Sequence, residues 1–119
     1  MARTSLTVAT TAASGVVITT GVAAESANGN EFTNTGREIA EITNGATQQV
    51  TATFVTNDTY DIGSTQYAVA DLAVVVATGT QQAVGPFDRT LFNSTTGTVQ
   101  INWTTATNCS VRVISLGTA

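Results

Sequence analysis

The sequence predicts an all-β protein: a single antiparallel β-sandwich or jelly-roll-like barrel of about eight strands, with an N-terminal arm. Threonine and valine together supply about a third of the residues, and both are β-branched and favour strands. Apolar and polar residues alternate with a period of two in several segments, which is typical of half-buried strands. Turn-forming residues separate these segments at intervals of roughly 8–14 residues, as in antiparallel sandwiches.

The chain has 119 residues, enough for one domain with its own core. We expect an arm over residues 1–14, which can also serve as a first strand, and one sandwich domain over residues 15–119. A free terminus is ordered when something holds it, so the arm is expected to dock on its own body or on a partner. No run of 18 apolar residues occurs, and polar residues interrupt residues 15–24, so we expect neither a membrane span nor a secretory signal.

The first half of the chain predicts short strands separated by turns. Apolar residues alternate over residues 6–10 and again at 16–18, and residues 25–30 carry Asn and Gly typical of turns. Residues 37–43 form a strand candidate that places Glu38 and Glu41 on opposite faces, which argues against a catalytic carboxylate pair.

An Asn44-Gly45 pair between two strand-like segments is a strong hairpin signal. Alternation at Val50, Ala52 and Phe54 then predicts a strand with one buried face. Residues 56–66 are the longest turn-rich segment and are expected to be a loop.

The second half contains one ambiguous run, residues 67–77. Its alanines permit a short helix, but its three consecutive valines favour a buried strand, which is the expected structure. A bend follows at Gly85-Pro86-Phe87, because proline cannot donate to a central ladder. Shorter segments that complete the sandwich are residues 81–84, 89–92, 99–103 and 111–113.

Missing residue types exclude most enzyme classes. The chain has no His, no Lys and a single cysteine, so Ser-His-Asp and Cys-His catalysis, Schiff-base chemistry and Cys/His zinc sites are absent. The formal net charge of −4 argues against direct binding of nucleic acid. We therefore predict a non-enzymatic protein with no catalytic residue, no metal and no cofactor.

A few residues could still carry chemistry. Asp58 and Asp61 are possible oxygen ligands for Ca²⁺, but their spacing lacks the motif of a calcium loop and ordinary Asx turns are favoured. Trp103, Tyr60 and Tyr67 could stack on a sugar or a base, yet Trp103 alternates with apolar residues and is expected in the core. Cys109 is expected to be a small buried apolar residue.

The arginines are the more informative group. Charged residues are 10% of the chain, and arginine favours interfaces through paired hydrogen bonds to carboxylates. We predict partner contacts at Arg3, Arg37 and Arg89, together with Phe87. The alternative is pairing within the chain, for example of Arg89 with Asp88 or of Arg37 with a nearby glutamate, and the sequence leaves both open.

Several short motifs follow one another in a fixed order along the chain. They are Met1-Ala2-Arg3-Thr4-Ser5-Leu6-Thr7, the segment Asn28–Arg37 followed by Asn44-Gly45, then Gly85-Pro86-Phe87, Phe92-Asn93 and Gly97-Thr98-Val99. This pattern resembles a group of small virion proteins of tailed bacteriophages. The chain departs from it in a longer segment at 56–66 and in lacking a second proline after Phe87.

The resemblance implies a head-associated protein that decorates or cements the capsid. Its implied partners are the major capsid protein and further copies of itself, a trimer being one candidate, without direct nucleic-acid or membrane contact. Its implied place is the virion capsid surface, after synthesis in the host cytoplasm.

Three other functions remain open. One is a different virion part, such as a head–tail joining, tail tube or fibre module, which a ring with an open lumen would indicate. Another is a carbohydrate-binding or adhesive β-sandwich, which requires an exposed aromatic platform. A small enzyme is the third, and the missing histidine and lysine weigh against it.

Overall fold

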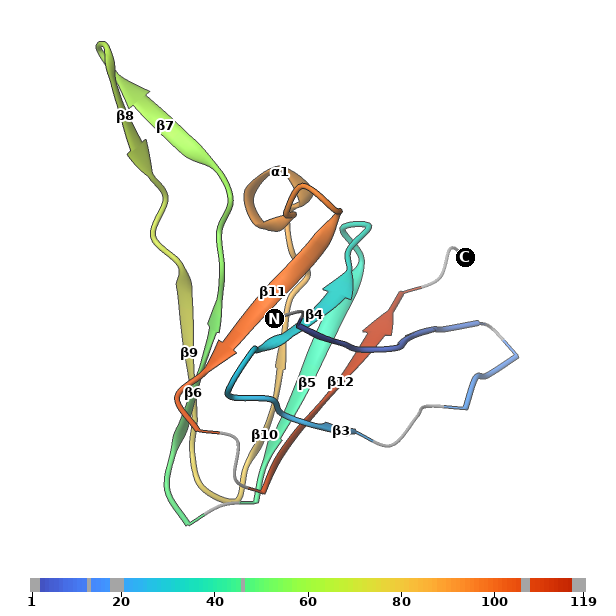
Figure 1. The fold of residues 1–119 in the computed structure, drawn as a ribbon. Coiled ribbons are helices and arrows are strands. Elements are labelled where there is room, and N and C mark those ends of the chain that lie inside the picture. The colour runs from blue at the N-terminus through green and yellow to red at the C-terminus, as the bar shows by residue number, and fades with distance from the viewer. Residues whose placement is uncertain (1–2, 13, 18–20, 46, 106–107, 117–119) are drawn as a thin grey trace.

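The structure is a computed structural model that describes residues 3–12, 14–17, 21–45, 47–105 and 108–116. Two sheets pack face to face (Figure 1). The first has the order β1 (Thr4–Ser5), β4 (Asn30–Thr33), β11 (Thr98–Trp103), β6 (Val50–Phe54), β9 (Leu72–Val76). The second has the order β10 (Gln81–Val84), β5 (Glu38–Asn44), β12 (Cys109–Ser115), β2 (Val8–Thr10), and β3 (Val22–Ala23) also pairs with β12. The predicted all-β sandwich is confirmed, and the described strands do not close into a barrel.

Period-two alternation builds the two central pairs of strands. Buried and partly exposed residues alternate without interruption along β6 and β12, and nearly so along β5 and β11. The inward side chains meet between the sheets, where Ile42 and Val111 are fully buried opposite Phe54 and Ile101 of the other sheet. Each such side chain stabilises the fold by about 1.5–3 kcal/mol relative to its exposed state. The core positions predicted from the sequence are therefore confirmed in these strands.

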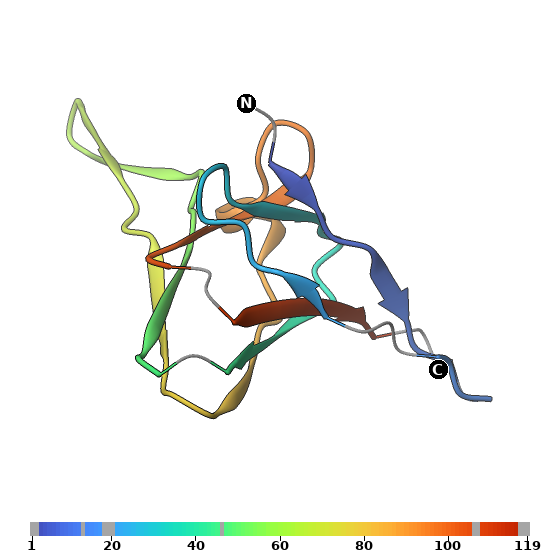
Figure 2. The ribbon, with the colours of Figure 1, turned by 60° about the horizontal axis from the view of Figure 1, so that its bottom comes forward.

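The N-terminal segment bridges the two sheets. β1 pairs with β4 in one sheet and β2 pairs with β12 in the other, and both pairs are parallel (Figure 2). Leu6, between them, is buried in the core. Residues 3–12 are thus docked on their own body, and they add parallel pairs to the antiparallel sandwich that we predicted. Of the alternating residues at 16–18, Ile18 lies outside the described residues, while Val16 and Val17 are exposed and not in a strand.

Residues 56–66, predicted to be a loop, contain a strand and the tip of a hairpin. β7 (Thr59–Ile62) and β8 (Thr65–Ala68) pair across a two-residue loop, in which Gly63 has a φ of +64°. A positive φ at the first loop residue is what a type II′ hairpin turn requires, and glycine adopts it without strain.

Residues 67–77 contain strands, as favoured, and no helix, but they belong to two strands. The prediction that this run is buried is wrong, because β8 is exposed and Val76 is the one buried residue of β9. β8 ends at Ala68 and β9 begins at Leu72. The interruption has a hydrogen-bonding role, because the Asp71 carboxylate accepts a bond of 2.9 Å from the backbone N–H of Thr56.

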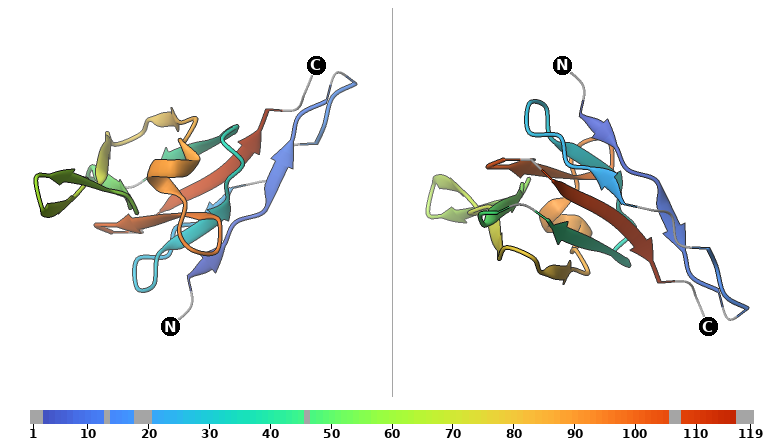
Figure 3. Two further views of the ribbon diagram at one scale, coloured as in Figure 1. Left: turned by 90° about the horizontal axis from the view of Figure 1, so that it is seen from above. Right: turned by 90° about the horizontal axis from the view of Figure 1, so that it is seen from below.

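Two segments project from opposite sides of the body. The β7–β8 hairpin extends from one side, and residues 11–12 and 14–17 extend from the other (Figure 3). The Cα radius of gyration is accordingly 14.9 Å, whereas a compact domain of this length has about 13.5 Å. The sandwich body is compact, and the projections account for the larger radius.

Candidate partner-contact surface

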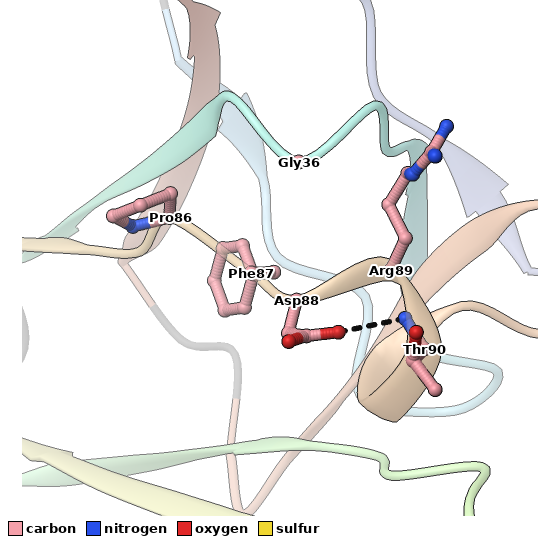
Figure 4. Close-up of a pocket in the computed structure, with 6 residues that line it drawn as sticks. All are labelled: Gly36, Pro86, Phe87, Asp88, Arg89 and Thr90. Carbon is pink, nitrogen blue, oxygen red and sulfur yellow. Dashed lines mark hydrogen bonds between the residues drawn. The ribbon is translucent and has the colours of Figure 1, made fainter.

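An open hollow of about 410 Å³ lies at one end of the sandwich (Figure 4). It is lined by Gly36, from the turn between β4 and β5, and by the segment Pro86–Thr90 that follows β10. The side-chain carbons of Arg89 lie against Gly36, since a Cβ added to that glycine would lie 3.7 Å from Arg89 Cγ. The hollow thus joins two segments that are about 50 residues apart in sequence.

The wall of the hollow is held by a short helix and its cap. Residues 89–92, counted among the strand segments in the sequence, form one helical turn, α1 (Arg89–Phe92). Asp88 caps it, accepting a 2.8 Å hydrogen bond from the backbone N–H of Thr90. The signal for this helix was Asp88, an N-cap residue type placed three residues before Leu91 and four before Phe92.

A pair of asparagine side chains fixes the same wall from behind. Asn34 Nδ2 donates to the Asn93 side chain at 2.7 Å and to the backbone oxygen of Phe87 at 3.1 Å. Asn93 Nδ2 returns a bond to the backbone oxygen of Asn34 at 3.2 Å. Asn34 is buried, so these bonds satisfy polar groups that would otherwise be costly to bury. The hollow is therefore a preorganised surface.

Phe87 belongs to the core as much as to the hollow. Its side chain is 1% exposed and packs on Phe32, Phe54 and Phe92, with ring centroids 5.6, 4.9 and 5.3 Å away. These tilted, stacked and edge-on pairs fasten the loop to β4 and β6 of the first sheet and to the short helix that contains Phe92. Any partner at this position meets the exposed neighbours Pro86 and Arg89, and the contact predicted for Phe87 stays a prediction.

The four arginines divide into two pairs. Arg112 forms an ion pair with Glu41 at 3.2 Å, and Arg3 Nη1 donates to the backbone oxygen of Ile101 and to Asn102 Oδ1. Arg37 and Arg89 are exposed, and their side chains have no hydrogen bond or ion pair among the residues that the structure describes. Both flank the hollow, Arg89 by lining it and Arg37 by following Gly36.

The two intrachain pairs named as alternatives do not form. The Asp88 carboxylate caps α1 by accepting from the backbone N–H of Thr90. The buried Glu38 carboxylate accepts bonds from the backbone N–H of Thr35 at 2.6 Å and of Arg37 at 3.2 Å. Its burial alone would raise its pKa, but the hydrogen bonds from Thr35, Ser115 and Arg37 outweigh burial and hold that pKa below its ordinary value. Glu38 therefore serves the turn between β4 and β5.

Arg3 does not line the hollow. Its guanidinium lies over Gly29, where a Cβ would meet the Ile101 oxygen at 2.5 Å. Gly29 has a φ of +76°, so a glycine is required here on two grounds. Arg3 fastens the arm to β11, and the structure does not bring it together with Arg37 and Arg89.

The remaining candidates for chemistry have structural roles. Asp58 Oδ1 accepts from the backbone N–H of its neighbour Thr59 at 2.8 Å, as a turn residue does. Trp103 is 7% exposed and donates its indole N–H to Asn30, which confirms the core position and removes it as an exposed sugar platform. Cys109 is buried, and burial raises the pKa of its thiol. The side chain of Tyr60 lies outside the described residues.

Among the described residues, no cluster of three or more His, Cys, Asp or Glu suited to a metal occurs, and no helix has the length and apolarity to span a membrane. Comparison of the chain with protein-family models, curated proteins and solved structures found no match.

The hairpin is the surface feature that sequence reasoning missed. Residues 61–68 are all exposed, including Ile62 at 63% and Tyr67 at 43%. A strand with neither face buried leaves no hydrophobic alternation, which is the signal by which the other strands were predicted. The remaining clue was Gly63-Ser64 between short β-branched and aromatic segments.

Proposed function

We propose that this chain is a non-enzymatic virion structural protein. In this proposal it decorates and stabilises the capsid of a tailed bacteriophage, binding the lattice of the major capsid protein as an oligomer. The observation that carries the proposal is the pair of unpartnered arginines beside a fixed hollow, on a body whose other described features serve packing. Arginines on a rigid surface are suited to binding another protein.

The fold supports a cementing role in energetic terms. A decoration protein must stay folded on the capsid, and the continuous core spanning both sheets stabilises this body. Its binding mechanism would be mass action: a protein that binds expanded shells and ignores precursors stabilises the expanded state. At a free concentration 100 times the dissociation constant, the gain is about 2.7 kcal/mol per site.

Co-sedimentation with capsids tests the proposal. The chain is mixed with expanded shells and, in parallel, with unexpanded precursors of the same phage. The expected result is saturable binding to expanded shells at a fixed ratio to the major capsid protein, with little binding to precursors. Absence of binding to either shell overturns the proposal.

The same preparations distinguish the other functions. Rings with an open lumen or tubes, seen by electron microscopy without shell binding, would indicate a head–tail or tail component instead. The carbohydrate-binding alternative loses Trp103 as its platform, because that side chain is buried.

A further inference from the structure

We infer that the β7–β8 hairpin of one copy docks into the hollow of a second copy of this chain. The contact is head-to-tail, so it repeats around a ring if the rotation closes. The inference deepens the proposed function and rests on it for the expectation that the chain self-associates. It assigns the hollow and the two arginines that carry the proposed function to contact between copies, and its test is separate from shell binding.

The hairpin requires a covering surface. Its described side chains are exposed, and a lone two-stranded hairpin is at best marginally stable in water. It leans away from α1 and from the body of its own chain (Figure 1). A second molecule is therefore the natural source of the missing contacts.

Charge identifies that second molecule as another copy. The sequence contains no lysine or arginine between Arg37 and Arg89, so Asp61 in the hairpin and Asp58 directly before it have no cation near them in sequence. The ion pair found among the described residues joins Arg112 to Glu41 and involves neither aspartate. An acidic hairpin and a hollow flanked by two unpaired arginines are complementary in sign.

The acceptor surface fits the apolar part of the hairpin as well. Ile62 lies at the hairpin tip, and the exposed Pro86 ring and the side-chain carbons of Arg89 offer apolar contact in the hollow. Asp88 also lines the hollow and keeps its negative charge while it accepts from the N–H of Thr90, so the surface is positive because two arginines outnumber one carboxylate. Because the asparagine pair fixes this wall, little ordering is needed on binding.

Charge reversal and exchange test the contact. Sedimentation equilibrium of the full chain gives the mass and the dissociation constant. Asp61→Arg and Arg89→Glu, each alone, are expected to raise that constant at least tenfold. The double variant Asp61→Arg/Arg89→Glu is expected to recover association, because the exchanged charges meet again across each contact.

The control matches the charge change of Asp61→Arg. Gln48→Arg/Gln49→Arg also raises the net charge by two, but on the exposed turn at the opposite end of the sandwich (Figure 1). It is expected to associate like the wild type. Thermal unfolding of every variant verifies that the body is folded, and Arg89→Glu, outside the hairpin, provides a readout if Asp61→Arg misfolds.

Three outcomes overturn the inference: a wild-type chain that stays monomeric at millimolar concentration, single variants that associate normally, or folded double variants that do not recover. Shell binding is measured separately. A wild-type oligomer that ignores expanded shells refutes the proposed function and leaves this inference intact. A chain that decorates shells as a monomer refutes this inference and the oligomeric part of the proposed function, and it leaves decoration itself intact.

Discussion

The sandwich body and the β7–β8 hairpin follow opposite physical rules. In the body, every second residue of β6 and β12 is buried, and two sheets share one core. In the hairpin, residues 61–68 are exposed on both faces, although the backbone pairing has an ordinary antiparallel register. β-branched and aromatic residues occur in both regions, and they serve stability in the body but not in the hairpin.

The difference in burial indicates that the body serves folding and the hairpin serves function. In the body, burial, the helix cap and the Asn34–Asn93 pair account for the residues of the core and for the fixed wall of the hollow. The hairpin contributes little to that core. A segment that a fold does not need for stability is a good candidate for contact with a partner.

Removal of the Phe87 ring should have the largest effect on the body. Phe87→Ala deletes a buried ring at the centre of the aromatic cluster, and such changes cost about 3–5 kcal/mol. Urea unfolding at neutral pH measures the loss. A cost under 1 kcal/mol would contradict the view that this loop is part of the core.

Removal of the Glu38 charge should have an intermediate, pH-dependent effect. Glu38→Gln loses charge-assisted bonds to Thr35 and Arg37, which we expect to cost about 1–3 kcal/mol at pH 7.

The pKa of Glu38 is lower in the folded chain than its unfolded value of about 4.3. Its stabilisation is therefore complete above the unfolded pKa and is lost as the pH falls through the folded pKa. Urea unfolding from pH 7 to pH 3 should show the wild type approaching the variant. A difference that stays constant over this range would exclude ionisation as its source.

A smaller effect is expected at the partly exposed Arg112–Glu41 pair. These side chains are 31% and 22% exposed, so Glu41→Gln should cost about 0.2–1 kcal/mol, and less at high salt. Glu31→Gln is a suitable control because Glu31 has no ion pair among the described residues. Equal salt dependence of the two variants would argue that the pair contributes nothing.

The smallest effect on folding is expected in the hairpin. Ile62→Ser removes an exposed apolar side chain and should change the free energy of unfolding by no more than about 0.5 kcal/mol. Measured below the association range, a loss of several kcal/mol would mean that the hairpin supports the body after all.

The strands of the body were predicted well because strands with one buried face show alternating apolar and polar residues in the sequence. Alternation at Val50, Ala52 and Phe54 and at Val111 and Val113 identified strands that have one buried face. It did not reveal β7 and the turn at Gly63, because exposed strands are stabilised by pairing alone. Nor did it separate β8 from β9, because the bond between Asp71 and Thr56 is a tertiary contact.

The candidate surface was predicted in part. Arg37 and Arg89 were singled out by their rarity, but their common position depends on how β4, β5 and β10 meet in space. Arg3 was grouped with them because the sequence could not show that its guanidinium lies over Gly29 and β11. Sequence patterns report burial along one strand, and sites assembled from separate loops require the fold.

Deletion of the β7–β8 hairpin tests most directly whether it serves self-association and not the stability of the body. Residues 59–68 are replaced by an Asn-Gly turn between Asp58 and Val69, whose backbones already share a hydrogen bond of 3.3 Å. Unfolding and mass are then measured on one sample. The account predicts a body within about 1 kcal/mol of the wild-type stability, as for surface changes, and a loss of self-association. An unfolded body, or a truncated chain that still associates like the wild type, would contradict it.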